Sequence, residues 1–215
     1  MSRFCHCILG AALLLPAASS AEERGFEVTV DGKPAGDFRM KVTALADGSE
    51  QVDMAADVKF RTFGIGYSYS SRSTEIWTDG RLRQLDSAVN DDGKKKRVKV
   101  ESDARGLTVV VNNRPTPCAK TALLATGWRL PPSDQKAFEA VVVDTEDGTQ
   151  TVARIEYVGD FQAKLPAGAV PGRRYKVTGK DLDAEWVFDG AGRPIHQTMK
   201  WDGHTVVLKL TGITK

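Results

Sequence analysis

Closely spaced Asp-Gly turns in the stretch from Tyr67 to Val111 constrain the fold of this chain more than any other feature. The turns are Asp79-Gly80, Asp91-Asp92-Gly93 and the four residues 103–106, and segments with alternating side chains separate them. Glycine readily takes the positive φ that tight hairpin turns need, so Asp-Gly between alternating segments is a strong hairpin signal. The stretch therefore predicts four consecutive antiparallel strands.

The same pattern continues through most of the chain. Asp31-Gly32, Asp47-Gly48 and Asp202-Gly203 predict further turns, and residues 52–60 alternate between apolar and polar side chains. Strict alternation is typical of a strand with one buried and one solvated face. The turns divide the sequence into eleven or twelve expected strands. The predicted fold class is all-β, a large antiparallel meander that curls into a half-barrel or bent sheet to protect its apolar face.

The first 21 residues differ from the rest. Arg3 precedes a mostly apolar run over 4–16, and the small residues 17–21 fit a signal-peptidase site. This pattern predicts a secretory signal peptide that is cut after Ala21. It also predicts a periplasmic location and a single antiparallel β domain over residues 22–215. A membrane anchor is the alternative interpretation, but the run is short for a bilayer core of about 30 Å.

The predicted mature chain is nearly neutral. The sequence has 30 basic and 28 acidic side chains, and cleavage removes one arginine and no acid. This balance gives no reason to expect nucleic-acid binding. The basic run 94–97 allows a patch for anionic lipid, but nearby acids favour a solvated hairpin end. Cys118 is the one cysteine after cleavage, so no intrachain disulfide can form, and burial is preferred over a reactive thiol.

Residues 119–139 break the alternation. Pro117 precedes this segment and Pro131-Pro132 interrupt it. After these prolines, Ser133 could cap a short helix over 134–139. Because the segment lies between two β-rich halves, we expect a helical or loop lid over the curved sheet.

Four apolar residues form the candidate ligand-binding set: Trp77, Leu123, Leu124 and Trp128. Tryptophans near strand ends and in a lid are consistent with an apolar pocket at the mouth of the sheet. Packing in the core or at its rim is the more common role of tryptophan and is the competing interpretation.

Enzyme and metal motifs are missing from the sequence. It contains no G-x-S-x-G, no H-E-x-x-H and no pair of cysteines at zinc spacing. His196, Met199, His204 and Cys118 are soft ligands for copper(I). His196 and Met199, however, are three residues apart and point to opposite faces of a strand. We therefore predict no catalytic residue, no metal site and no cofactor.

Several segments resemble an uncharacterised family of exported bacterial all-β proteins of unknown function. They are FEVTVDGKPAGDFRMKV, TEIWTDGRLRQLDSAVNDDGKKKRVKV, TALLATGW and GKDLDAEWVFDGAGRPIHQTMKWDGHTVVLKL. The resemblance covers nearly the whole mature chain, but Arg129-Leu130 follows Trp128 where the family often has Asn-Pro. The layout is also similar to the lipoprotein-carrier fold, in which a bent antiparallel sheet with a lid covers an apolar concavity. That second likeness is one of architecture.

Together these features predict a periplasmic, non-enzymatic protein that holds a hydrophobic or amphiphilic ligand, such as a lipid, under residues 119–139. One alternative is a module that binds another envelope protein through an exposed strand edge. A hydrolase with an unrecognised motif is the third reading. No membrane span is expected in the mature chain.

Overall fold

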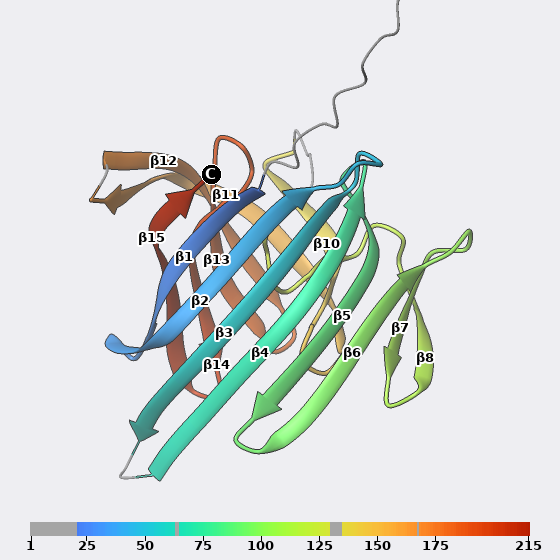
Figure 1. Ribbon diagram of the computed structural model, residues 1–215, viewed down its shortest axis with the longest axis horizontal. Helices are drawn as coiled ribbons and strands as arrows, with labels where there is room; N and C mark the ends of the chain where they lie inside the picture. The colour runs from blue at the N-terminus through green and yellow to red at the C-terminus, as the bar shows by residue number, and fades with distance from the viewer. Residues whose placement is uncertain (1–20, 63–64, 130–134, 167) are drawn as a thin grey trace, which may run out of the picture.

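The computed structural model describes residues 21–62, 65–129, 135–166 and 168–215. These residues form one sheet of fifteen strands (Figure 1). The strands are β1 (Ala21–Val30), β2 (Lys33–Ala44), β3 (Glu50–Thr62), β4 (Ile65–Thr78), β5 (Arg81–Asp91), β6 (Lys94–Ser102), β7 (Leu107–Val111), β8 (Arg114–Cys118), β9 (Leu123–Leu124), β10 (Ala137–Val143), β11 (Gln150–Leu165), β12 (Gly168–Gly179), β13 (Leu182–Asp189), β14 (Pro194–Trp201) and β15 (His204–Thr214).

Two antiparallel meanders meet in the centre of the sheet, where β1 pairs with β15. From this pair, β2 to β8 follow in order toward one edge, and β14 to β10 follow toward the other. The short strand β9 is outermost and runs parallel to β10. The predicted all-β, bent antiparallel sheet is confirmed, with two meanders in place of one.

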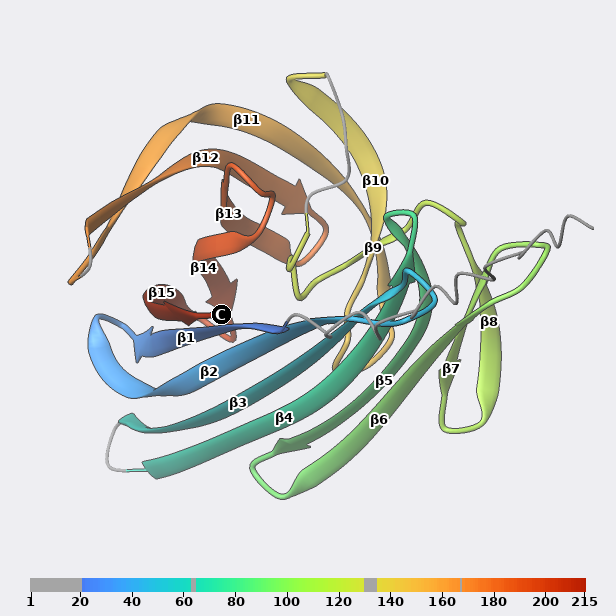
Figure 2. The ribbon, with the colours of Figure 1, turned by 45° about the horizontal axis from the view of Figure 1, so that its top comes forward.

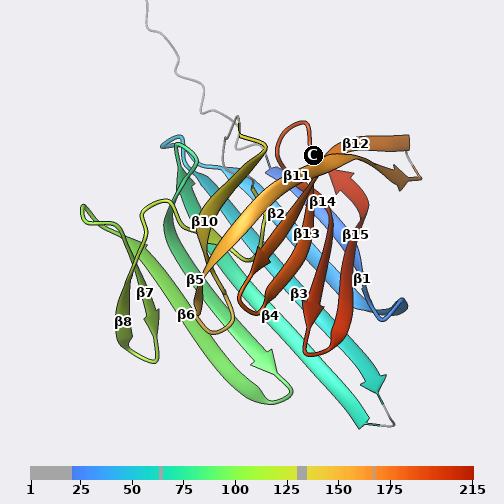
Figure 3. The ribbon, with the colours of Figure 1, turned by 180° about the vertical axis from the view of Figure 1, so that it is seen from behind.

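The sheet curls so that its two edges approach each other, as Figure 2 and the rear view in Figure 3 show. At the start of β11, Gln150 Nε2 donates a hydrogen bond to the carbonyl oxygen of Pro117 in β8 at 3.2 Å. The Tyr69 hydroxyl on β4 donates to Glu146, which lies between β10 and β11, at 2.7 Å. These contacts link strands that lie far apart in the sheet, so the inner face is largely enclosed.

The hairpin turns have the geometry that the sequence predicts. Asp31-Gly32, Asp79-Gly80 and Asp202-Gly203 have positive φ at both residues. This is the pattern of a type I′ turn, whose twist matches that of the flanking strands. Asp tolerates the left-handed region better than most residues, and glycine enters it without steric cost.

The core follows the predicted alternation. Phe26, Val28 and Val30 on β1 are buried, and the residues between them are more exposed. The larger apolar cluster fills the inner face of the first meander and extends to β15. A smaller cluster lies between β10 and strands β11 to β13. β10 separates the two, because Val143 packs in the larger cluster and Val142 in the smaller one.

No helix is present in the described ranges, so the predicted helical lid is wrong there. Residues 137–139, expected to be helical, belong to β10 and pair with β11. Phe138 and Ala140 alternate with outward residues and pack against the smaller cluster. The free energy gained from this partial burial outweighs the helix-capping preference that the sequence suggested for Ser133. Ser133 lies outside the described residues. No helix within those ranges is long and apolar enough to cross a bilayer.

Candidate functional site

Residues 119–129, which we call the plug, enter the inside of the curved sheet after the exposed residues 119–121, and residues 122–124, 127 and 128 are buried there. Leu123 and Leu124 pair with the end of β10, and the Ala125 N–H donates to the carbonyl oxygen of Val143 at 2.9 Å. A tight turn follows, in which the Gly127 N–H donates to Leu124 O at 3.1 Å. The segment that the sequence suggests as a lid therefore lies within the molecule.

The structure brings together three of the four predicted ligand-binding residues. Trp77 on β4 and Trp128 in the plug are 6% and 1% exposed, and their ring centroids lie 5.1 Å apart in an edge-to-face arrangement. Leu124 packs in the same cluster. Leu123 points to the other side of the plug and joins the smaller cluster. All four side chains lie in protein contacts, and a role toward a ligand stays a prediction.

At Gly127 the plug backbone lies in close contact with side chains of β13 and β14. Its φ is +54°, and an added Cβ would lie 2.8 Å from Gln197 Nε2 and 3.0 Å from the Trp186 ring. Gln197 on β14 donates to Thr126 O at 3.0 Å and to Gly127 O at 3.2 Å. A side chain at this position would therefore meet both backbone strain and a steric clash.

A buried carboxyl group lies beneath the plug. Glu75 on β4 is 0% exposed and accepts hydrogen bonds from Trp77 Nε1 at 2.8 Å and from Thr126 Oγ1 at 3.0 Å. Burial raises the pKa of Glu75 to about 7, although these donors act in the opposite direction. The Trp128 indole N–H also lowers this pKa, but it does not reach hydrogen-bond geometry with any described acceptor.

The sequence analysis did not select Glu75, although a signal for it was present. Glu75 and Trp77 are two residues apart on a strand, so their side chains lie on the same face. The pairing register places Glu75 between Val52 on β3 and Leu85 on β5, both 0% exposed. A carboxylate in phase with a buried Trp is unusual enough to mark a candidate site.

An ionic cluster covers Trp128 on the side away from the core. Arg129 and Arg193 both pair with Glu50 at the start of β3, and the Arg193–Glu50 distance is 2.5 Å. The Arg193 guanidinium lies 4.8 Å from the Trp128 ring centroid. Burial alone would raise the pKa of Glu50, but the two arginines hold it below its usual value. Glu50 therefore favours the ionised form, whereas burial favours the protonated form of Glu75.

A second group of polar and aromatic residues lies at the opposite end of the strands. The Tyr67 hydroxyl donates to Asp91, and Trp201 packs against the rings of Tyr67 and Tyr69. Burial raises the pKa of Glu146, the acceptor of the Tyr69 hydroxyl. Each of these polar groups has a partner within the protein, so this end is held closed by its own side chains.

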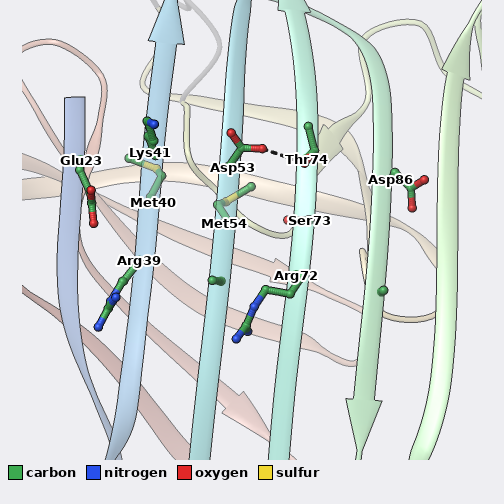
Figure 4. A pocket seen from close by; sticks show the side chains of 12 residues that line it. Glu23, Arg39, Met40, Lys41, Asp53, Met54, Arg72, Ser73, Thr74 and Asp86 are labelled. Atoms are coloured by element: carbon green, nitrogen blue, oxygen red, sulfur yellow. Dashed lines mark hydrogen bonds between the residues drawn. The ribbon is translucent and has the colours of Figure 1, made fainter. Parts of the chain in front are cut away.

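An open hollow lies on the outer face of β1 to β5. It encloses about 680 Å³, and Figure 4 shows its charged side chains standing on neighbouring strands. We call it the outer-face groove. Its outward-pointing residues are Glu23, Arg39, Lys41, Asp53, Ala55, Arg72, Thr74, Asp86 and Ala88.

A row in which small residues and arginines alternate crosses this groove, and its members Arg39, Ala55, Arg72 and Ala88 line it. The pairing registers place Gly25, Arg39, Ala55, Arg72, Ala88 and Arg97 in one row across six strands. Adjacent strands lie about 4.8 Å apart, so the arginines are spaced by about 10 Å. Arg72 pairs with Asp57 at 2.7 Å and Arg97 pairs with Asp86 at 2.7 Å, whereas Arg39 has no partner in the described part of the chain.

The residues considered for metal or thiol chemistry remain dispersed. His196 contacts Thr198, His204 contacts Asp31, and Cys118 is a half-buried free thiol at the end of β8. Burial raises the pKa of Cys118, which disfavours the reactive thiolate. No group of three or more metal-binding side chains occurs among residues that the structure describes.

Comparison with known proteins identifies the family and the fold. Residues 26–211 match the model of a family described as a domain of unknown function, DUF6134, and the chain belongs to that family. The fold is similar to the crystal structure of a beta-barrel-like protein of domain of unknown function DUF1849 from Brucella abortus. That match has a TM-score of 0.64 at 10% identity and covers 90% of this chain and 96% of the other. A search of curated proteins found no significant match.

Proposed function

We propose that this protein is a non-enzymatic binding module of the bacterial envelope, whose outer-face groove binds an extended acidic segment of another envelope protein. The row of arginines on alternate strands carries this proposal. The periplasmic location rests on the predicted signal peptide.

The arginines of the row favour an acidic partner, since two of the three acids that line the groove already have partners, Asp86 with Arg97 and Asp53 with Thr74. Arg39 has no anion of its own within the described residues, and the Arg72–Asp57 pair is exposed on both sides. Exposed ion pairs contribute little to stability, so a ligand carboxylate can replace the Asp at small cost. Ala55 and Ala88 leave room between the arginines for the backbone of an extended segment.

The free edge at β8 is a poor site for strand addition. Pro115 and Pro117 pair with Val110 and Thr108 on β7. Proline has no N–H to donate, and prolines on an edge strand discourage further strand pairing. The groove is therefore preferred over the exposed edge as the contact surface.

Site-specific photo-crosslinking in the full chain tests this proposal. A photoreactive residue at Ala55 or Ala88 should give one discrete product in the periplasm, and the same residue at Thr108 on β7 should not. Arg39→Glu should abolish the product, whereas Arg81→Glu, an exposed charge outside the groove, should leave it. The same product from Thr108, or none from the groove, would overturn the proposal.

A second candidate function is the holding of a hydrophobic or amphiphilic ligand, such as a lipid, inside the sheet. The position of the plug favours it, because Leu124 and Trp128 occupy enclosed space that an apolar ligand would otherwise fill. Such a ligand would have to displace the plug. A fluorescent fatty-acid probe should then bind Gly127→Ala more tightly than the parent protein, and equal binding would remove this candidate.

A further inference from the structure

We propose that Glu75 and the plug form a proton-controlled latch, in which the protonated carboxyl keeps the plug seated and the ionised carboxylate favours its release. This inference is independent of the outer-face groove and concerns the opposite face of the same strands.

A negative charge on Glu75 would be costly in the closed structure. The Glu75 side chain is fully enclosed, and two hydrogen-bond donors reach it, Trp77 Nε1 and Thr126 Oγ1. A buried carboxylate needs a cation or several donors to offset the loss of water. No cation pairs with Glu75 in the described ranges, so the neutral form suits the closed structure better.

The charged residues in this region form ion pairs with one another and not with Glu75 in the part of the chain that the structure describes. Its neighbours on β3 and β5 are Val52 and Leu85, and the contact from β14 to the plug comes from neutral Gln197. Glu50 with Arg129 and Arg193 forms a charged cluster at Trp128, and these groups neutralise one another in part. The buried Arg24 on β1 pairs with Glu22 and Asp189. These groups leave Glu75 as the titrating group that contacts the plug directly.

One further pair of acids lies near the plug attachment. Burial raises the pKa of Asp144, which follows Val143 on β10, and that of nearby Glu146. Val143 O accepts the Ala125 N–H, so titration of these acids could also reach the plug. The Glu75→Gln variant described below separates the two sources.

Release of the plug would expose the Glu75 carboxyl group to water. Thr126 and Trp128 cover Glu75 from the plug side. The plug is held to the wall by the short β9–β10 pairing, by the hydrogen bond from the Ala125 N–H to Val143 O, and by the Gln197 side chain, whose Nε2 donates to Thr126 O and Gly127 O. When the plug leaves, water can reach the carboxylate, and its pKa returns toward the ordinary value of 4.5. Ionisation and release therefore favour each other.

Linkage predicts the size of the effect. A carboxyl with a pKa of about 7 when the plug is seated and 4.5 when it is released couples opening to pH. The opening constant should rise about tenfold per pH unit between these values and level off above them. From pH 5.5 to 8 the expected rise is about twentyfold to thirtyfold.

Hydrogen exchange of the full chain, corrected for the intrinsic pH dependence of amide exchange, measures this directly. The amides of Ala122, Ala125 and Gly127, which are hydrogen-bonded in the seated plug, should lose protection by that factor. Amides in the β1–β2 hairpin serve as the reference and should not change. Glu75→Gln should make the plug profile flat.

Two further variants distinguish a latch from a merely weakened plug. Thr126→Val removes one donor to the carboxylate and should shift the midpoint of the pH profile upward. Gly127→Ala should increase opening by the same factor at every pH, because it adds strain without changing a titrating group. An unchanged pH profile in Glu75→Gln would overturn the latch. Exchange of the plug only together with the β1–β2 amides would overturn it as well.

Discussion

Strands β4 and β5 present two contrasting carboxyl groups on their opposite faces. Glu75 points inward and pairs in register with Leu85, while the next pairing step joins Thr74 to Asp86, which points outward. Burial raises the pKa of Glu75, whereas hydrogen bonds from Arg97 hold the pKa of Asp86 below its usual range. The same chemical group thus has opposite preferences at the two positions, because solvent and a cation reach Asp86, whereas Glu75 is fully buried and has no ion-pair partner among the residues that the structure describes.

This contrast indicates which face is suited to binding a partner and which face is suited to a response to pH. On the outer face, exposed ion pairs such as Arg97–Asp86 are exchangeable and contribute little to folding. On the inner face, the plug, Glu75 and two tryptophans are in direct contact. A change in the charge or position of one of these groups therefore alters the contacts of the others. Binding therefore suits the outer face, and coupling to pH suits the inner face.

The largest expected effect is at the centre of the inner face. Trp128→Ala should lower the free energy of unfolding by about 3–5 kcal/mol, because it removes a large side chain that cannot be replaced by water. Trp201→Ala, at a half-exposed tryptophan, is the matched control and should cost less. Urea unfolding monitored by circular dichroism measures both. A smaller loss for Trp128 than for Trp201 would show that the plug is not part of the cooperative core.

The next largest effect is the pH dependence of stability. The pKa of Glu75 is higher in the folded state, so its contribution is fully present below about pH 4.5 and is lost as pH rises through about 7. The parent should lose up to about 3 kcal/mol more than Glu75→Gln across this window. Urea unfolding of both proteins at several pH values gives the difference, in which the other carboxyl groups cancel. Parallel curves would contradict the assignment.

The smallest effect is expected on the outer face. Asp86→Asn should change the free energy of unfolding by less than about 1 kcal/mol, since its partners Arg97 and Lys99 are well exposed. The difference should shrink further at high salt, which screens exposed pairs. Thermal melting at low and high ionic strength measures it. A loss as large as that of Trp128→Ala would mean that the two faces do not differ as described.

Much of the fold was predictable because its signals are local. The Asp-Gly turns fix hairpins through the φ values of two residues, and the alternation fixes which face of each strand is buried. The candidate site was predictable in part, since Trp77, Leu124 and Trp128 do converge. The sequence shows that Glu75 and Trp77 share a strand face, but it gives no signal that Thr126, 51 residues further along the chain, contacts the same carboxyl group.

The sequence by itself determined most of the strands, their hairpin turns and the inward faces, because these follow from backbone conformation and from a period of two residues. It predicted eleven or twelve strands where the described residues form fifteen, and a helix where β10 begins. Tertiary structure alone decided that β1 pairs with β15, that residues 119–129 enter the sheet as a plug, and that Glu75 lies beneath it. Those outcomes depend on contacts between residues far apart in the chain. The closure of the sheet is one such outcome, since Gln150 and Pro117 lie on strands near opposite ends of the sheet order and meet only in the curled molecule. The free energy of burying a segment is set by the surface that it meets, and that surface exists only in the folded molecule.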